Sequence, residues 1–231
     1  ERQISRETKL IVLTNLHNPT GVLTSEATLK AVGEIAKRNG ARVLVDEVYL
    51  EAMYEQRPRP ACHLGDQFVV TSSLTKAYGL GGLRCGWALA EPEVAARMRQ
   101  IHDLFCSTAV YLSELVSAIV LDHLSTVAER AKTILAANWK AFDELLAPIP
   151  NLILTPHRFG TIACPRLPMG IMERFLQKLR TKYDTSVVPG RFFAMPRFFR
   201  VGLGGDTQMT RAGLERLAQA LGDWHIAAQP A

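Results

Sequence analysis

The sequence predicts an α/β protein. We expect a mainly parallel β-sheet with flanking helices, followed by a smaller C-terminal α+β domain. Three short apolar runs, at 10–13, 43–45 and 68–70, are continuous rather than alternating. Such runs are typical of strands that are buried on both faces of a parallel sheet. From Pro92 onward a long helical pattern separates these strands from a shorter mixed segment.

A helix is expected between the first two apolar runs. Thr24 or Ser25 can cap its first turn, and Gly40 ends it. Its apolar residues recur at helical spacing and so share one face; they are Leu29, Val32, Ile35 and Ala36. Strand, helix and strand together form a crossover unit, which joins parallel neighbours. A further strand is expected at 87–89.

The rest of the chain alternates between helical and extended patterns. Helical periodicity extends over 92–105, 109–123 and 126–146, and Pro148 and Pro150 end the last helix. The elements expected after it are a strand near 152–164, a helix near 170–183, a strand near 198–203 and a final helix near 209–221.

Composition excludes several classes of protein. The 231 residues are 48% hydrophobic and 21% charged, a balance that allows a buried core and excludes disorder. No apolar run reaches the length of a membrane span, and the first residues lack a signal core, so we expect a cytoplasmic protein without a membrane partner. The net charge of +5 comes from scattered basic residues, so no nucleic-acid partner is expected. The cysteines and histidines form no metal-binding motif, so no metal is expected.

Four short motifs follow the expected strands in order. They are N-P-T-G at 18–21, D-E-V-Y at 46–49, S-L-T-K at 73–76 and G-L-G-G-L-R-C-G-W at 79–87. In an open parallel sheet, ligands bind outside the carboxyl ends of the strands, which is where these motifs fall. Each motif alone also fits a plainer interpretation: a turn for the first, a helix cap or surface acid for the second, and a surface lysine for the third.

Taken together, the motifs resemble those of the fold-type-I pyridoxal-phosphate enzymes, and within them the class I and II aminotransferases. Asn18, Asp46, Lys76 and Arg84 are separated by 28, 30 and 8 residues. A fifth element, the F-R-V-G segment that contains Arg200, lies 124 residues after Lys76, where that family has its substrate arginine. The resemblance covers the chain from about residue 9 to residue 222.

The resemblance implies how the cofactor ring would be held. Lys76 would form the Schiff base with pyridoxal 5'-phosphate, and its amine, once released, would move a proton to and from the substrate α-carbon. Asp46 would pair with the pyridine nitrogen and keep it protonated. Asn18 and Tyr49 would donate hydrogen bonds to the ring hydroxylate.

The resemblance also implies sites for two anionic groups. Ser73 and Arg84 would bind the cofactor phosphate, the arginine through a charge-assisted pair. Arg200 would bind the α-carboxylate of the substrate through its planar fork, and Asn18 would lie beside that substrate.

The family also implies a domain organisation. Residues 1–106 would be the C-terminal portion of the large domain that binds pyridoxal phosphate, 107–146 connecting helices, and 147–231 the small C-terminal domain. The family's N-terminal half has no counterpart in the sequence. We therefore expect a fragment that binds the cofactor weakly by itself, from a parent that works as a homodimer.

The implied activity is that of an amino-acid aminotransferase, which passes an amino group from an amino acid to a 2-oxo acid. Two alternatives stay open. One is another fold-type-I pyridoxal-phosphate enzyme, such as a C–S β-lyase, because the same residues serve several reactions. The other is a non-catalytic, aminotransferase-like sensor domain of a transcription regulator. The identity of the amino donor and acceptor stays open as well.

Overall fold

The computed structural model describes residues 3–106, 108–154, 159–167 and 170–227, with side chains as far as Trp224. The chain forms two compact units. The sheet unit comprises residues 1–18 and 22–128, and the small unit comprises residues 19–21 and 129–231. The three-part division at residues 106 and 146 stays a prediction. No helix in the described part of the chain is both long and apolar enough to cross a membrane.

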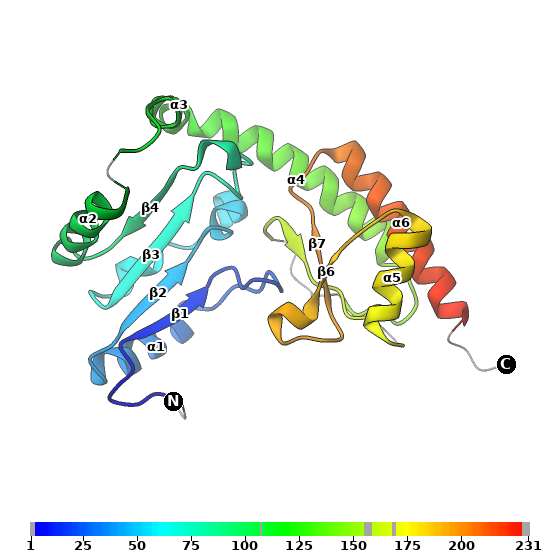
Figure 1. Cartoon of the computed structure of the whole chain (residues 1–231), viewed down its shortest axis with the longest axis horizontal. Coiled ribbons are helices and arrows are strands. Elements are labelled where there is room, and N and C mark those ends of the chain that lie inside the picture. The colour runs from blue at the N-terminus through cyan, green and yellow to red at the C-terminus, as the bar shows by residue number, and fades with distance from the viewer. Residues whose placement is uncertain (1–2, 107, 155–158, 168–169, 228–231) are drawn as a thin grey trace. The chain divides into compact units, whose positions relative to one another are not determined.

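The sheet unit is built on four strands in the order β1-β2-β3-β4 (Figure 1). They are β1 (Leu10–Thr14), β2 (Arg42–Asp46), β3 (Phe68–Ser73) and β4 (Gly86–Leu89). The first three are parallel, as the continuous apolar runs predict. The expected burial on both faces is wrong for β1, where Leu10 and Val12 are 51% and 60% exposed. β4 is antiparallel to β3. A parallel return needs a long crossover, whereas the connection from β3 to β4 holds only the short 3-10 helix η3 (Gly81–Leu83).

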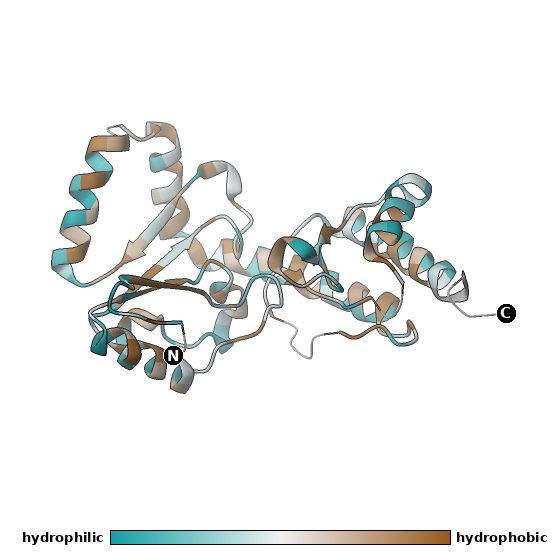
Figure 2. Cartoon of the chain, turned by 60° about the horizontal axis from the view of Figure 1, so that its bottom comes forward, coloured by the Kyte–Doolittle hydropathy of each residue, from teal (hydrophilic) through white to brown (hydrophobic). Residues whose placement is uncertain are grey.

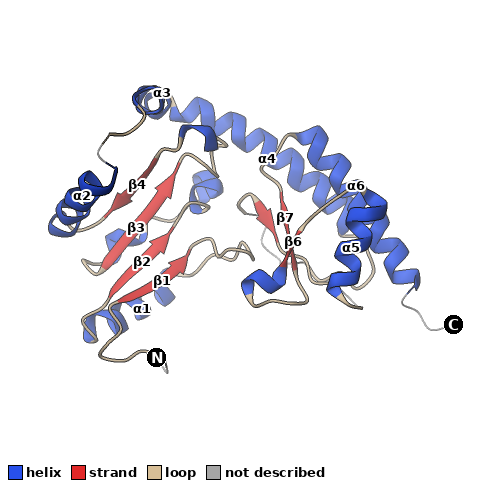
Figure 3. Cartoon of the chain, viewed as in Figure 1, coloured by secondary structure: helices blue, strands red, loops and turns tan. Residues whose placement is uncertain are grey.

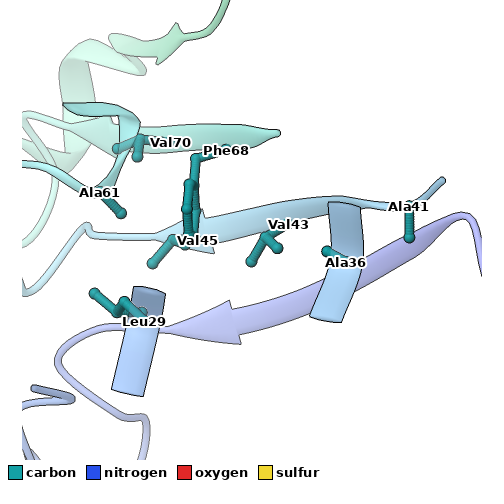
Figure 4. Close-up of a cluster of buried hydrophobic side chains, with 8 residues drawn as sticks. All are labelled: Leu29, Ala36, Ala41, Val43, Val45, Ala61, Phe68 and Val70. Atoms are coloured by element: carbon teal, nitrogen blue, oxygen red, sulfur yellow. The ribbon is translucent and has the colours of Figure 1, made fainter. Parts of the chain in front are cut away.

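Helix α1 (Glu26–Arg38) lies between β1 and β2 in the chain and packs on the sheet (Figure 4). Ser25 caps it, because its hydroxyl accepts a hydrogen bond from the Thr28 N–H at 3.2 Å. Its apolar face meets the strands in one cluster of buried residues, which comprises Leu29, Ala36, Ala41, Val43, Val45, Ala61, Phe68 and Val70. This cluster holds the three parallel strands in register from one side.

Three helices follow the sheet (Figure 3). They are α2 (Pro92–Cys106), α3 (Tyr111–Asp122) and α4 (Leu124–Leu146). The predicted helices are confirmed to within two residues at each end. Large apolar side chains on α2 and α3 are exposed, among them Leu104 at 81% and Phe105 at 84%. Figure 2 colours the ribbon by hydropathy, with hydrophobic residues in brown.

The small unit contains a three-stranded antiparallel sheet in the order β5-β7-β6. Its strands are β5 (Ile162–Ala163), β6 (Val188–Pro189) and β7 (Phe199–Gly202), and its helices are α5 (Met172–Tyr183) and α6 (Thr207–Ala227). The strand expected near 152–164 is shorter than predicted, since only its last part forms β5; residues 155–158 lie outside the described residues. β6 was not predicted, because two residues are too few to show a period.

Asn138 connects α4 to the loop that follows β7. Its side-chain amide donates hydrogen bonds to the Leu203 carbonyl at 2.7 Å and the Gly205 carbonyl at 2.9 Å. Next to it, the Trp139 indole N–H donates to the Gly160 carbonyl at 3.0 Å. The Asn138 bonds anchor the loop that follows β7, the strand that carries Arg200, and the Trp139 bond anchors the segment that precedes β5.

Short 3-10 helices fill the connections after β2 and within the small unit. They are η1 (Leu50–Gln56), η2 (Ala61–Leu64) and η4 (Gly190–Phe193). The turn before η1 contains Glu47, a carboxyl group that is only 3% exposed. Its Oε1 accepts the Ala61 N–H at 2.9 Å. Burial raises the pKa of Glu47 to about 7, against the smaller opposing effect of this hydrogen bond.

Replacing Gly33 tests the packing of α1 on the sheet. A Cβ at this position would lie 2.7 Å from Cε2 of the buried Phe68 ring, which cannot move aside. Gly33→Ala should therefore destabilise the protein by about 1–3 kcal/mol despite the better helix propensity of alanine. The matched control is Gly213→Ala in α6, where an added Cβ meets nothing within 4 Å. This substitution should stabilise the folded protein by about 0.5–1 kcal/mol. The free energy of unfolding in urea measures both effects. A change in the same direction in both variants would contradict the close packing of Gly33 against Phe68.

Glu47 should make stability depend on pH. Its pKa is raised from 4.5 to about 7 on folding, so the folded state binds the extra proton. The stability it contributes is complete below about pH 4.5 and is lost as the pH rises to about 7, by up to roughly 3 kcal/mol at 1.36 kcal/mol per pKa unit.

Glu47→Gln should remove this dependence, because glutamine can still accept the Ala61 N–H without bearing a charge. Urea unfolding at about pH 5 and about pH 8 measures the effect. Glu34→Gln, at an exposed position of α1, is the control. An equal pH dependence in the two variants would show that Glu47 does not titrate as described.

Candidate active site

The parallel strands bring two of the predicted site segments to one edge of the sheet. Asp46 ends β2 and pairs in register with Thr14 on β1 and Thr71 on β3. Asn18 lies in the turn that follows β1, where its backbone N–H donates to Thr14 Oγ1 at 2.9 Å. The turn that bears Asn18 and the Asp46 carboxylate therefore lie at the carboxyl ends of neighbouring strands.

Asp46 and Tyr49 differ in exposure. Asp46 is half-buried, and its Oδ1 accepts the Val48 N–H at 3.1 Å, which fixes the carboxylate against the following turn. Only one of the two oxygens is used by that bond, so Oδ2 can accept a proton donor from a ligand. Tyr49 is 6% exposed and immediately precedes η1. Its ring belongs to the core of the sheet unit.

Ser73 and Arg84 lie at the same edge as Asp46. Ser73 ends β3, two residues beyond Thr71, and pairs with Gly86 at the start of β4. Because β4 is antiparallel, the residues that precede it share the edge at which β3 ends. The hydroxyl of Ser73 is hydrogen-bonded to that of Thr75 and accepts the Thr75 N–H at 3.3 Å.

Arg84 has a left-handed backbone, with φ 54° and ψ 29°. A non-glycine residue adopts this conformation rarely. Here it occurs at the residue where η3 ends. Its Nη1 donates to the Gly81 carbonyl at 3.1 Å. The arginine lines a pocket of about 450 Å³ together with Cys85, His102 and Ser113. The guanidinium is exposed and available to an anion.

Lys76 lies in the turn between β3 and β4. Two backbone bonds close this turn: Leu74 N–H donates to the Cys85 carbonyl at 3.1 Å, and Leu80 N–H donates to the Leu74 carbonyl at 3.0 Å. The Leu74 side chain is fully buried. The Lys76 side chain is exposed and, among the residues that the structure describes, makes no hydrogen bond or ion pair. A fixed backbone therefore presents an amine that is not paired with an acid.

Arg200 belongs to the small unit and lies on β7, opposite Val188 of β6. Its guanidinium stacks over the Phe193 ring, with 5.0 Å between Cζ and the ring centroid. Cation–π stacking of this kind orients the guanidinium plane. A guanidinium is a planar fork of donors, a shape that suits a carboxylate.

Sequence reasoning did not find two residues that contact the Lys76 turn, or the arginine that pairs with one of them. Tyr54 and Glu51, both in η1, contact Ala77 and Tyr78, and Arg57 pairs with Glu51 at 3.3 Å. Periodicity gave no signal for them, because η1 is a short 3-10 helix. The structure thus collects Asn18, Asp46, Tyr49, Ser73, Lys76 and Arg84 in the sheet unit. Their binding roles, and that of Arg200, stay predictions.

Known proteins share both the sequence pattern and the fold. The model of the family "Aminotransferase class I and II" matches residues 1–220. Capreomycidine synthase of Streptomyces vinaceus is 26% identical over 95% of this chain and 57% of its own length. An aromatic aminotransferase of Arabidopsis thaliana is 27% identical over 92% of this chain and 55% of its own length.

A solved structure shows the same similarity. The PLP-dependent aminotransferase from Streptococcus suis superposes with a TM-score of 0.88 at 28% identity, over 96% of this chain and 59% of that protein. The chain thus spans little more than half the length of these relatives. With the motif order, the sheet topology and the family match in agreement, the chain belongs to the class I and II aminotransferases.

Proposed function

We propose that the protein carrying these residues is a pyridoxal-phosphate-dependent aminotransferase that transfers an amino group from an amino acid to a 2-oxo acid. The observation that carries the proposal is the Lys76 amine. It is exposed, has no partner among the described residues, and sits on a fixed turn at the edge of the sheet where Asp46, Ser73 and Arg84 also lie. Relatives that are named aminotransferases support the same activity.

The residues at this edge fit the groups of pyridoxal phosphate by their chemistry. The Lys76 amine suits the aldehyde, the Asp46 carboxylate suits the pyridine nitrogen, and the Arg84 guanidinium with the Ser73 hydroxyl suits the phosphate. When bound, this cofactor supplies an electron sink for the negative charge that develops at the substrate α-carbon.

The chain's own residues then perform the proton chemistry. Lys76 Nζ is the base that takes the proton from the substrate α-carbon. Asp46 holds a proton on the ring nitrogen, because a nearby carboxylate favours the charged form of that nitrogen. The phenol of Tyr49 and the amide of Asn18 orient the ring through its hydroxyl group.

Arg200 is the proposed recognition group for the substrate. A guanidinium binds a carboxylate through two parallel hydrogen bonds, which lysine cannot reproduce. The ring of Phe193 holds the guanidinium plane in place. Asn18 is the proposed second contact of the substrate.

A homodimer and a cytoplasmic location stay predictions. The exposed apolar side chains of α2 and α3 support an assembled state, because exposed apolar patches mark association surfaces.

One relative is named a synthase rather than an aminotransferase. A different reaction on the same cofactor is therefore the second candidate, and amino donors should be screened for both 2-oxo acid and other products.

Lys76→Ala tests the central role. It should abolish the absorbance of the lysine-bound cofactor and lower amino transfer by at least about 100-fold, because the base is lost. Both are measured with pyridoxal phosphate in excess. Lys140→Ala, which removes an exposed lysine of α4, should leave both unchanged. Transfer that persists without the Lys76 amine would overturn this assignment.

Arg200→Lys tests substrate recognition. Loss of the paired hydrogen bonds to a carboxylate should raise KM for the amino acid by about 10- to 100-fold, which corresponds to about 1.5–3 kcal/mol. Cofactor absorbance should not change. Arg191→Lys is the matched control, since Arg191 pairs with Glu173 at 3.5 Å on the surface. An unchanged KM in Arg200→Lys would exclude this arginine from the substrate site.

A further inference from the structure

Two tyrosine hydroxyls hold the turn that carries Lys76. The first belongs to Tyr54, whose phenol donates to the Ala77 carbonyl at 3.2 Å. Ala77 is the residue that follows Lys76, and it is 2% exposed. This hydrogen bond therefore acts on the peptide unit between Ala77 and Tyr78, one residue beyond the lysine.

The second hydroxyl belongs to Tyr78, which is 5% exposed and donates to Glu51 Oε2. Glu51 is held in turn by Arg57, whose Nη1 lies 3.3 Å from Glu51 Oε1. Burial raises the pKa of Tyr78, and the Glu51 carboxylate adds to the effect. The phenol thus keeps its proton and remains a donor.

Both attachments come from the same segment. Glu51 and Tyr54 lie in η1, which begins directly after Tyr49. The segment that follows the Asp46 motif is therefore bonded to the turn that bears Lys76, at two successive residues. These bonds add to the backbone bonds that close the turn at Leu74.

The backbone of Tyr54 is itself unusual, with φ 50° and ψ −116°. This conformation is unfavourable for a residue with a Cβ, and it persists only where the surroundings determine it. It interrupts the helical geometry of η1 at the residue whose hydroxyl bonds to Ala77. Tyr54 therefore both has the strained backbone and donates the hydrogen bond to the Lys76 turn.

We propose that Tyr54 and Tyr78 are positioning residues, which hold the Lys76 turn so that its amine meets the aldehyde of pyridoxal phosphate in a reactive orientation. This inference rests on the function proposed above. The reason is geometric: attack on an aldehyde requires an aligned approach, and a displacement of about 1 Å can cost about 100-fold in rate. In the described part of the chain, Lys76 makes no side-chain hydrogen bond or ion pair that could replace the support of its backbone.

The test measures how fast Lys76 reacts with the cofactor. The chain is mixed with pyridoxal phosphate and reduced with borohydride, which leaves a stable secondary amine on each lysine that reacted. Peptide mass spectrometry then gives the ratio of label on Lys76 to label on Lys140, an exposed lysine of the same chain. This ratio reports how well Lys76 is placed for the reaction. Because unfolding would also lower the ratio, each variant is labelled under conditions in which its far-UV circular dichroism matches that of the unaltered chain.

Tyr54→Phe and Tyr78→Phe remove the hydroxyls and keep the rings. Each should lower the Lys76-to-Lys140 ratio by about tenfold. Tyr183→Phe is the matched control, because it also removes a bond from a phenol to a carboxylate, that of Asp223 in the small unit. It should leave the ratio unchanged.

Glu51 provides a second pair of variants that does not change either tyrosine. Glu51→Gln keeps an acceptor for the Tyr78 hydroxyl and should retain most of the ratio, whereas Glu51→Ala should lower it as Tyr78→Phe does. Wild-type ratios in Tyr54→Phe, Tyr78→Phe and Glu51→Ala would overturn the positioning role and leave the proposed function intact. If Lys76 of the unaltered chain reacts no faster than Lys140, the proposed function fails, and this role fails with it.

Discussion

The parallel ladder formed by β1, β2 and β3 is the constraint on which the site depends. Parallel strands end at the same edge, so residues that are far apart in the sequence meet there. Asp46 lies in register with Thr14 and Thr71. The antiparallel β4 then brings the Arg84 segment back to the edge where β3 ends. The buried cluster around Phe68, packed against α1, keeps this register fixed.

The chemistry at the carboxyl edge of the sheet depends on a fixed backbone turn and an exposed lysine amine. Backbone bonds and two tyrosine hydroxyls hold the turn around Lys76, while its amine has no partner among the described residues. An amine that is not paired with an acid is more accessible to an aldehyde than the amine of a salt-bridged lysine. Glu51 differs from Lys76 in this respect, because its carboxylate forms an ion pair with Arg57 and accepts a hydrogen bond from the Tyr78 hydroxyl.

Much of the sheet unit could be predicted from the sequence, because each parallel strand contains a short, continuous apolar run and α1 carries a recognisable cap at Ser25. The direction of β4 was harder to predict, since it depends on the length and content of a connection. β6 has only two residues and shows no period. The contacts from η1 to the Lys76 turn could not be predicted, because they join residues 23 and 27 positions apart through side chains alone. The motif residues themselves were recognisable from their order and spacing.

A crystal structure of the protein grown with pyridoxal phosphate is the most direct test of the assignment at this edge. The assignment predicts cofactor density joined to Lys76 Nζ, with the ring nitrogen at the Asp46 carboxylate and the phosphate at Arg84. Cofactor joined to another lysine, or bound away from the carboxyl ends of β1, β2 and β3, would contradict it.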